Sequence, residues 1–281
     1  MRLTAYLDRL DVSGPLRPDL ATLRRLHLAH RETFLFENLT IQSGGSIGLA
    51  LADLERKFLD DGRGGYCFEH NTLFAAALRA IGFAPVTLLG RVRRGPPERW
   101  CRTHMVLAVT DRNVLDGAAQ RAEGPGGATC WLCDVGFGGL GLLEPIALRD
   151  GARAVQGGFE YALRREDRLW VLSMRDAAGA ALDLYEFTDD PQTAWDVEVA
   201  NHFTSTHPQS VFRRTITIQR SSVAERVILR GDALTRYRDG RPTETAVAAH
   251  ERSRLARELF GVTLPASPLV CDQYPSEKLT T

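Results

Sequence analysis

The chain contains 281 residues, with 35 basic and 35 acidic side chains that leave it formally uncharged at pH 7. This length is enough for two domains, or for one domain with substantial additions, around a large hydrophobic core. The arginines are interspersed with acids, so we expect no binding to nucleic acid. Asp8 lies where a signal peptide would need its apolar core, and no apolar run is long enough to cross a bilayer. We therefore expect a cytoplasmic protein that does not bind a membrane.

The N-terminal third is predicted to be helical. Asp19 is placed to cap a first helix that carries leucines on or near one face, and a second helix is expected over residues 50–59. His27 and His30 lie on the first of these helices without an acidic or cysteine partner at ligand spacing. We therefore interpret both histidines as surface or packing residues.

A short glycine turn leads into Cys67. The turn contains Gly64 and Gly65, and the apolar residues after Cys67 recur at helical spacing as far as Gly82. Cys67 is therefore expected in the first turn of a helix, where unpaired amides and the helix dipole favour a thiolate, and a nearby imidazolium would favour it further. The alternative is a buried, inert cysteine, since free cysteine is among the most buried residue types.

Beyond Gly82 the pattern changes from helical spacing to short strands. These segments are rich in apolar and β-branched residues and are separated by turn residues, which is typical of β-structure. The expected strands cover residues 84–92, 103–110, 131–137, 160–164 and 169–174. They predict a β-rich middle domain of barrel form, with a flexible surface loop at residues 121–127.

The last third combines strands with one helix. After a polar stretch at residues 201–208, strands are expected over 211–219 and 224–230, and a helix over 245–260. The tail after Leu264 is expected to be loosely held.

Five cysteines at irregular spacings do not indicate a disulfide framework in a chain of this size. They are Cys67, Cys101, Cys130, Cys133 and Cys271. Cys130 and Cys133 form a CxxC pair, but positions three apart on a strand point to opposite faces, and no second ligand pair follows. We expect no metal site, and free thiols fit a reducing compartment.

A cysteine nucleophile needs a base to accept its proton and an acceptor to orient that base. His104 lies near the start of a predicted strand, and Asp134 lies in another, where an unpaired charge would be costly. Two adjacent strands would bring them together. Taken singly, a strand histidine is more often a core residue, and an aspartate before a glycine-rich turn is more often a cap.

At these residues the chain resembles the arylamine N-acetyltransferase family. That family shows an Arg-Gly-Gly-x-Cys-x-Glu turn, a strand histidine and an Asp-x-Gly-Phe-Gly segment in this order. Here they correspond to residues 63–69, His104 and residues 134–138. The similarity extends to residues 36–39 and 201–208 and to segments near both ends, and so covers nearly the whole chain.

The resemblance implies an α+β fold of the papain-like, cysteine-nucleophile kind with three domains. Residues 1–85 would form a helical domain that carries the nucleophile, residues 86–195 a β-barrel domain that carries the histidine and aspartate, and residues 196–281 an α/β lid. The implied catalytic triad is Cys67, His104 and Asp134. It would move an acetyl group from acetyl-CoA to an arylamine, arylhydrazine or N-hydroxyarylamine by a ping-pong mechanism through an acetyl-cysteine, with acetyl-CoA as cosubstrate and no tightly bound cofactor.

Other residues gain roles from the same resemblance. Glu37 and Arg63 match a buried ion pair that would hold the loop before the nucleophile. The aromatic side chains expected around the acceptor pocket, each of which would otherwise be ordinary core, are Phe36, Phe137 and Phe203. The residues expected to contact coenzyme A are Thr103, Gly136, Gly138 and Phe203.

Two departures from the family pattern stand out. His70 occupies a position that is usually apolar. One alternative is a base that competes with the triad histidine, but one helical turn past the thiol we expect it to tune the local charge or face solvent. The interval from His104 to Asp134 is longer than usual, and a loop can absorb this because each doubling of loop length costs only about 0.6 kcal/mol.

Other functions suit the same order of cysteine, histidine and aspartate. One is an amide synthase of secondary metabolism with the same triad, and another is a protease or transglutaminase, although a secreted protease would be expected to carry a signal and disulfides. A scaffold that binds coenzyme A or a partner without catalysis is the non-enzymatic alternative.

Overall fold

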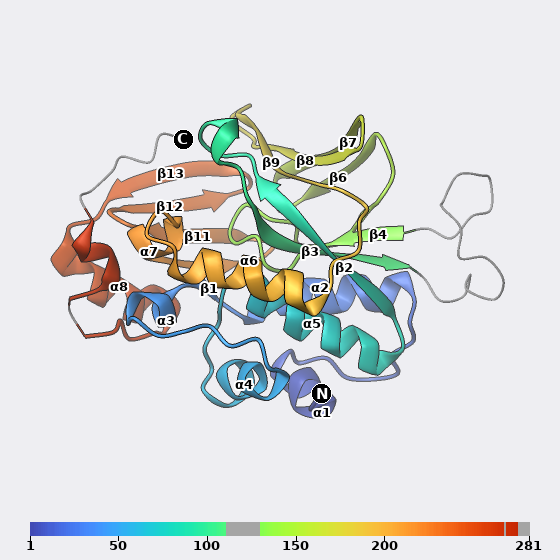
Figure 1. The fold of residues 1–281 in the computed structure, drawn as a ribbon, viewed down its shortest axis with the longest axis horizontal. Helices are drawn as coiled ribbons and strands as arrows, with labels where there is room; N and C mark the ends of the chain where they lie inside the picture. Colours follow the sequence, from blue (N-terminus) through green and yellow to red (C-terminus); the bar gives the residue numbers. More distant parts are fainter. Residues whose placement is uncertain (111–129, 267, 275–281) are drawn as a thin grey trace.

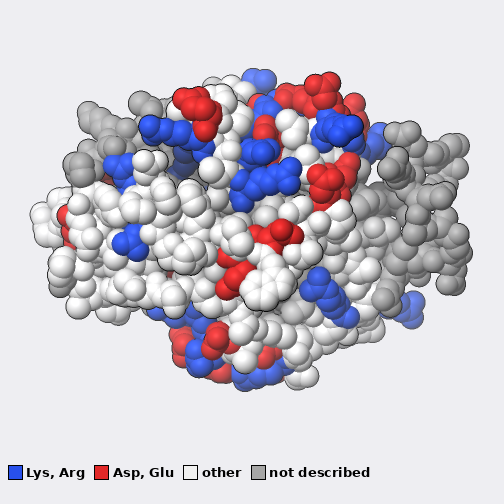
Figure 2. All heavy atoms as spheres, in the orientation of Figure 1, with Lys and Arg blue, Asp and Glu red and all other residues white. Residues whose placement is uncertain are grey.

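The computed structural model of the chain describes residues 1–110, 130–266 and 268–274 (Figure 1). It has an α+β fold in which N-terminal helices lie beneath two antiparallel sheets in this view, one of eight strands and one of five. The loop predicted at residues 121–127 lies outside the described residues. On the face shown in Figure 2, basic and acidic side chains lie side by side in the upper and lower parts, and the left part carries few charges.

The N-terminal helices form where apolar residues recur at helical spacing. The elements are α1 (Leu3–Arg9), α2 (Leu20–Thr33), β1 (Phe36–Glu37), α3 (Leu39–Gln42), α4 (Leu51–Glu55) and α5 (Cys67–Ile81). Asp19 caps α2, because its Oδ1 accepts a hydrogen bond of 2.8 Å from the amide of Thr22. The helix predicted over 50–59 is present as α4 followed by a π-helical turn, Arg56–Asp60.

The eight-stranded sheet holds the order β5-β4-β3-β2-β9-β8-β7-β6. Its strands are β2 (Ala84–Val92), β3 (Arg102–Thr110), β4 (Cys130–Cys133), β5 (Ile146–Ala147), β6 (Ala152–Gln156), β7 (Phe159–Glu166), β8 (Leu169–Arg175) and β9 (Ala181–Phe187). The two end strands, β5 and β6, come into contact, so the sheet curls into a nearly closed barrel. Alternate residues, including Phe159, Tyr161 and Leu163, fill its interior.

The strand predicted over 131–137 is shorter than expected. β4 ends at Cys133, and Asp134 begins a turn in which its own Oδ1 accepts a hydrogen bond of 2.9 Å from the amide of Gly136. An aspartate that bonds its own backbone two residues on favours a turn over a strand. Asp134 therefore lies just beyond a strand, and not inside one.

The five-stranded sheet holds the order β1-β10-β11-β12-β13 and so recruits β1 from the N-terminal part. Its other strands are β10 (Thr217–Ser221), β11 (Glu225–Arg230), β12 (Ala233–Arg238) and β13 (Arg241–Ala246), and the neighbouring helices are α6 (Ala194–Thr206), α7 (Val211–Arg214) and α8 (Arg252–Phe260).

Three sequence predictions for this region were wrong. The strand expected over 211–219 is α7 followed by β10, because the hydroxyl of Ser210 caps a helical turn. The helix expected over 245–260 begins only at Arg252, since residues 241–246 pair with β12 as an exposed edge strand. The tail is held as far as Cys271, whose amide donates to Gln42 Oε1 at 2.9 Å.

Buried apolar residues form three clusters, and each draws on more than one stretch of sequence. The first joins the N-terminal helices to β3 and α6, the second fills the barrel, and the third lies between the five-stranded sheet and α8. The division into domains at residues 85 and 195 stays a prediction.

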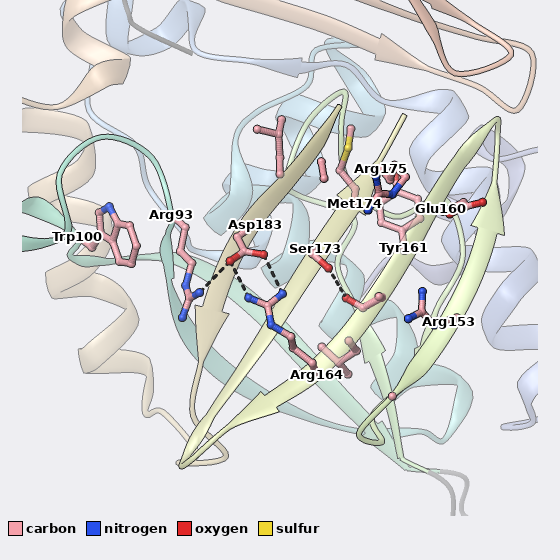
Figure 3. A pocket seen from close by; sticks show the side chains of 15 residues that line it. Arg93, Trp100, Arg153, Glu160, Tyr161, Arg164, Ser173, Met174, Arg175 and Asp183 are labelled. Atoms are coloured by element: carbon pink, nitrogen blue, oxygen red, sulfur yellow. Dashed lines mark hydrogen bonds and ion pairs between the residues drawn. The ribbon is translucent and has the colours of Figure 1, made fainter. Parts of the chain in front are cut away.

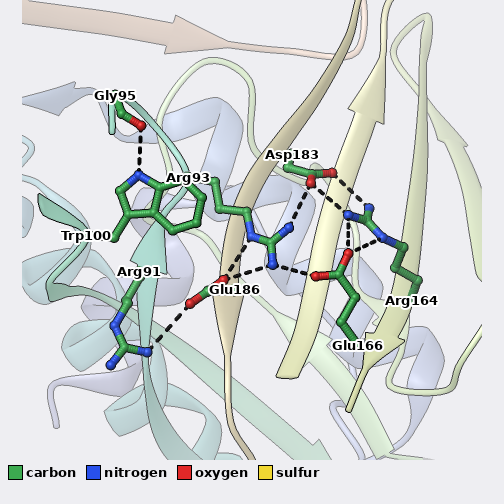
Figure 4. A network of polar contacts seen from close by, with 8 residues as sticks. All are labelled: Arg91, Arg93, Gly95, Trp100, Arg164, Glu166, Asp183 and Glu186. Carbon is green, nitrogen blue, oxygen red and sulfur yellow. Dashed lines mark hydrogen bonds and ion pairs between the residues drawn. The ribbon is translucent and has the colours of Figure 1, made fainter. Parts of the chain in front are cut away.

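A groove of about 690 Å³ crosses the outer face of β7, β8 and β9 (Figure 3). Small side chains, including Ala162 and Ser173, line its floor. Arg93 lies at one end, where it forms ion pairs with Glu166 and Asp183 at 2.6 and 2.9 Å within a wider network (Figure 4). None of the three predicted triad residues lines this groove.

The ion pair expected between Glu37 and Arg63 joins β1 to the turn before α5. Arg63 Nη2 lies 2.8 Å from Glu37 Oε1, and the Glu37 side chain is fully buried while that of Arg63 is 33% exposed. Lys57 Nζ lies 4.0 Å from the same carboxylate oxygen. The glutamate is therefore buried with one close cation and a second one nearby.

We expect Arg63→Ala to lower the free energy of unfolding by about 2 kcal/mol. This is less than the ~3–5 kcal/mol typical when a buried pair is broken, because Lys57 still compensates part of the Glu37 charge. Arg56→Ala is the matched control, since its pair with Asp53 is exposed and should contribute below about 1 kcal/mol. Chemical denaturation measures both, and equal losses would contradict the assigned importance of Glu37.

Candidate active site

Cys67 is the first residue of α5 and is 3% exposed. The turn before it is packed against β1: the amide of Gly65 donates to the carbonyl of Leu35 at 3.2 Å, and the amide of Glu37 donates to the carbonyl of Gly65 at 2.8 Å. Gly64 lies so close to the Leu35 carbonyl that any side chain would collide with it. The glycine turn therefore places the thiol at a helix N-terminus, where the Cys67 amide has no helical partner.

Glu69 completes this helix start. Its Oε2 accepts a hydrogen bond of 3.1 Å from the amide of Tyr66, and its Oε1 lies 2.6 Å from Lys57 Nζ. The sequence analysis assigned no role to Glu69, although a glutamate three residues after the N-cap is the signal of a capped helix.

The three predicted triad residues come together. His104 on β3 places Nε2 2.8 Å from Asp134 Oδ2, and the two residues are 2% and 0% exposed. Because Nε2 faces Asp134, Nδ1 is the nitrogen left for Cys67, which is among the groups that raise the pKa of the imidazole. In its protonated form the thiol also faces the carbonyl of Thr103 at 3.7 Å.

The charges of His104 and Asp134 stabilise each other. Burial alone would lower the pKa of His104, but the charge and hydrogen bond of Asp134, together with Cys67, raise it to about 10. Burial alone would raise the pKa of Asp134, but His104, the amide of Gly136 and the side chain of Asn71 lower it to about 2. The imidazole is therefore protonated at neutral pH, which is the state that a neighbouring thiolate requires.

Two residues that the sequence analysis did not assign to the site hold Asp134. Asn71 Nδ2 donates to Asp134 Oδ1 at 3.2 Å and to the carbonyl of Met105 at 2.8 Å. The amide of Asp134 donates to His27 Nε2 at 3.1 Å, while His27 Nδ1 donates to the carbonyl of Leu143 at 2.8 Å. Asn71 lies four residues after Cys67, so helical spacing alone would have placed it on the same face. No local signal points to His27.

Aromatic rings surround the imidazole on the barrel side. Phe137 meets the His104 ring edge-on with centroids 5.2 Å apart, and Tyr185 on β9 lies at 4.8 Å. Of the other rings expected at the acceptor pocket, Phe36 is 4% exposed, and Phe203 on α6 is 37% exposed. Of Phe36, Phe137 and Phe203, only Phe137 contacts the ring of His104.

Two of the residues expected to contact coenzyme A, Gly136 and Thr103, lie beside the nucleophile, and Phe203 is part of α6. Gly136 packs against the backbone of Cys67, where a Cβ would approach the Cys67 Cα to 2.7 Å. The carbonyl of Gly138 accepts a hydrogen bond of 2.5 Å from the buried Arg31. Thr103 presents its carbonyl to the thiol. A role in binding coenzyme A stays a prediction for all of them.

Among residues 1–110, 130–266 and 268–274, no three or more His, Cys, Asp and Glu side chains are grouped so as to hold a metal ion. In the same ranges, no helix combines the length and the apolar character that a membrane span requires.

Comparisons with known proteins place the chain among acetyltransferases. The sequence pattern of the N-acetyltransferase family matches residues 19–269. An arylamine N-acetyltransferase of Mycolicibacterium smegmatis is 36% identical over 248 residues, which cover 85% of this chain and 84% of that protein. An arylamine N-acetyltransferase / N-hydroxyarylamine O-acetyltransferase of Salmonella typhimurium is 35% identical over 244 residues, or 86% and 81% of the two chains. The solved structure of Mycobacterium marinum arylamine N-acetyltransferase in complex with CoA matches with a TM-score of 0.81 at 32% identity and covers 92% of each chain.

The stability that the His104–Asp134 pair contributes should depend on pH. The raised pKa of His104, about 10, makes its contribution complete below its unfolded value near 6.5 and lost as the pH rises toward 10. The lowered pKa of Asp134, about 2, makes its contribution complete above about 4 and lost as the pH falls toward 2. The difference in Tm between the wild type and His104→Gln should therefore be largest between about pH 4 and 6.5.

Calorimetry at constant ionic strength measures this difference, and His250→Gln, at an exposed position, is the control that should show no such profile. A difference in Tm between wild type and His104→Gln that stays constant from about pH 5 to 10 would contradict the ion pair.

Proposed function

Because the chain belongs to the arylamine N-acetyltransferase family, we propose that it transfers an acetyl group from acetyl-CoA to an arylamine through an acetyl-cysteine at Cys67. The observation that supports this most directly is the buried row of thiol, imidazole and carboxylate, with His104 Nε2 2.8 Å from Asp134. Arylhydrazines and N-hydroxyarylamines are further proposed acceptors, and the Salmonella typhimurium relative bears an N-hydroxyarylamine activity in its name.

In the first half-reaction, the Cys67 thiolate attacks the carbonyl carbon of the thioester. The carbon–sulfur bond of the donor breaks, the acetyl group stays on Cys67, and the departing thiolate of CoA takes the proton from His104. The amide of Cys67 at the start of α5 is a donor for the oxyanion that forms. Asp134 keeps the imidazole oriented and remains ionised throughout.

In the second half-reaction, the amine nitrogen attacks the acetyl carbon, and neutral His104 removes the proton from that nitrogen. The bond between the acetyl carbon and Cys67 breaks, which restores the thiolate and the imidazolium. Because the first product leaves before the acceptor reacts, the kinetics should be ping-pong.

The acceptor ring is proposed to lie beside Phe137. That residue is half-buried and meets the His104 ring edge-on at 5.2 Å, so a flat aromatic amine stacked on it brings its nitrogen near the base. Phe36 and Phe203 line the same pocket in this proposal. All five cysteines are free, which fits the cytoplasmic location that we propose.

Intact mass spectrometry after mixing with acetyl-CoA alone should detect one added acetyl group on the wild type, and an arylamine should then remove it. Cys67→Ala should show no adduct, and His104→Gln should form it more slowly by roughly 10²- to 10⁴-fold, because it lacks the acid–base group.

Cys101→Ala removes an exposed thiol and is the matched control that should acetylate normally. An adduct that persists in Cys67→Ala, or cleavage of a peptide without any adduct, would overturn the proposal and, in the second case, favour a protease.

A further inference from the structure

Three buried side chains outside the triad form a continuous hydrogen-bonded row. The hydroxyl of Tyr6 on α1 lies 2.8 Å from His30 Nδ1 on α2, and His30 Nε2 lies 2.9 Å from His70 Nδ1 on α5. His70 Nε2 then lies 3.0 Å from the carbonyl oxygen of Leu35. Tyr6 and His30 are 0% exposed and His70 is 1% exposed, so water does not compete for these contacts.

The end of the row determines where every proton sits. A carbonyl oxygen only accepts, so His70 Nε2 must carry a hydrogen and donate to Leu35. In neutral His70, Nδ1 is then an acceptor, so His30 Nε2 carries a hydrogen and donates it to His70 Nδ1. His30 Nδ1 is in turn an acceptor, and it accepts the hydrogen bond that the hydroxyl of Tyr6 donates. Only one arrangement with two neutral imidazoles satisfies all the contacts, and it directs each donor toward Leu35.

The Leu35 carbonyl is the point at which this row meets the nucleophile turn. The same oxygen accepts the amide of Gly65 at 3.2 Å, and Gly64 packs directly on it. Residue 36 and Gly65 form an isolated parallel bridge beside it. A movement of this carbonyl would displace the glycine turn, and with it Cys67 two residues further on.

We propose that His70 is a positioning residue for acyl transfer: its Nε2–H holds the Leu35 carbonyl and so the Gly64–Gly65 turn that places the Cys67 sulfur. His30, whose Nε2–H is donated to His70 Nδ1, supports the tautomer that this contact needs. This rests on the proposed function, because the sulfur is positioned for attack on an acyl donor. It replaces the expectation that His70 tunes local charge or faces solvent.

The surroundings keep the row neutral. Burial, then the positive charges of Arg31 on α2 and Lys57 in the π-helical turn, lower the pKa of His70 to about 3 against its hydrogen bonds to backbone. Burial and the neighbouring His70, His27 and Arg31 hold the pKa of His30 well below its ordinary value. Both rings therefore stay neutral, and the row stays intact throughout the neutral pH range.

Two isosteric substitutions of His70 separate its two contacts. His70→Gln places an amide nitrogen near the position of Nε2 and keeps a donor for Leu35, whereas His70→Asn places its amide near Nδ1 and keeps a partner only for His30. Tyr6→Phe removes the far end of the row and leaves the Leu35 contact untouched. All three lose part of a buried network and should lower Tm.

The rate of acetyl-cysteine formation with acetyl-CoA should fall roughly 10- to 100-fold in His70→Asn, because a displaced nucleophile loses its alignment. His70→Gln and Tyr6→Phe should stay within about threefold of the wild type, whatever their Tm. Rates that simply follow Tm across the three variants, or an unchanged rate in His70→Asn, would overturn the proposal. If His70→Asn does not fold, a slow His70→Gln beside a normal Tyr6→Phe would also overturn it.

Alkylation of Cys67 by iodoacetamide, without any acyl donor, keeps this test separate from the proposed function. The alkylation rate at Cys67, measured against that at the exposed Cys101, should change in His70→Asn and not in His70→Gln. Failure of the wild type to form any acetyl adduct would instead refute the acyl-transfer function itself. An unchanged Cys67 alkylation rate in His70→Asn would refute the positioning role.

Discussion

The buried contact between His104 and Asp134 is the interaction on which the site depends. Two charges at 2% and 0% exposure are tolerable inside a protein only when each satisfies the other. The surrounding residues stabilise this pair, because Asn71 and the amide of Gly136 donate hydrogen bonds to the carboxylate. The imidazole is carried by β3 of the barrel. The start of α5 then places the thiol of Cys67 beside this pair.

Four buried histidines in this molecule behave differently although their burial is nearly the same. His27, His30, His70 and His104 are between 0% and 2% exposed. The pKa of the first three is lowered and that of His104 is raised, because only His104 faces a carboxylate. His27 also contacts Asp134, but through the backbone amide, which donates a hydrogen bond to His27 Nε2. Because that nitrogen must be an acceptor, the His27 ring is neutral. Burial lowers the pKa of all four rings, and only at His104 does a carboxylate partner outweigh burial and raise the pKa.

Sequence patterns described the elements whose stability is mainly local. The strand at 84–92 and the helix that begins at Cys67 were predicted at their observed limits, because alternation, helical spacing and flanking glycines all agree there. Predictions were wrong where a capping or turn-forming side chain, or the edge of the preceding strand, outweighed the apolar pattern. Residues 241–246 form a strand because β12 offers an edge, and residues 211–214 form a helical turn because Ser210 caps it. Asp134 looked like a strand residue until its side chain closed a turn.

The sequence by itself determined which residue types are available for the chemistry and the family to which the protein belongs. The short motifs and their order can be read along the chain without knowing how the chain folds. Only the tertiary structure decided which polar groups meet. It brought His27 and Asn71 to Asp134 and joined Tyr6, His30 and His70 into one row. The physical reason is that periodicity reports which face of an element is buried, whereas the hydrogen-bond partner of a buried polar group is supplied by another element, far away along the chain.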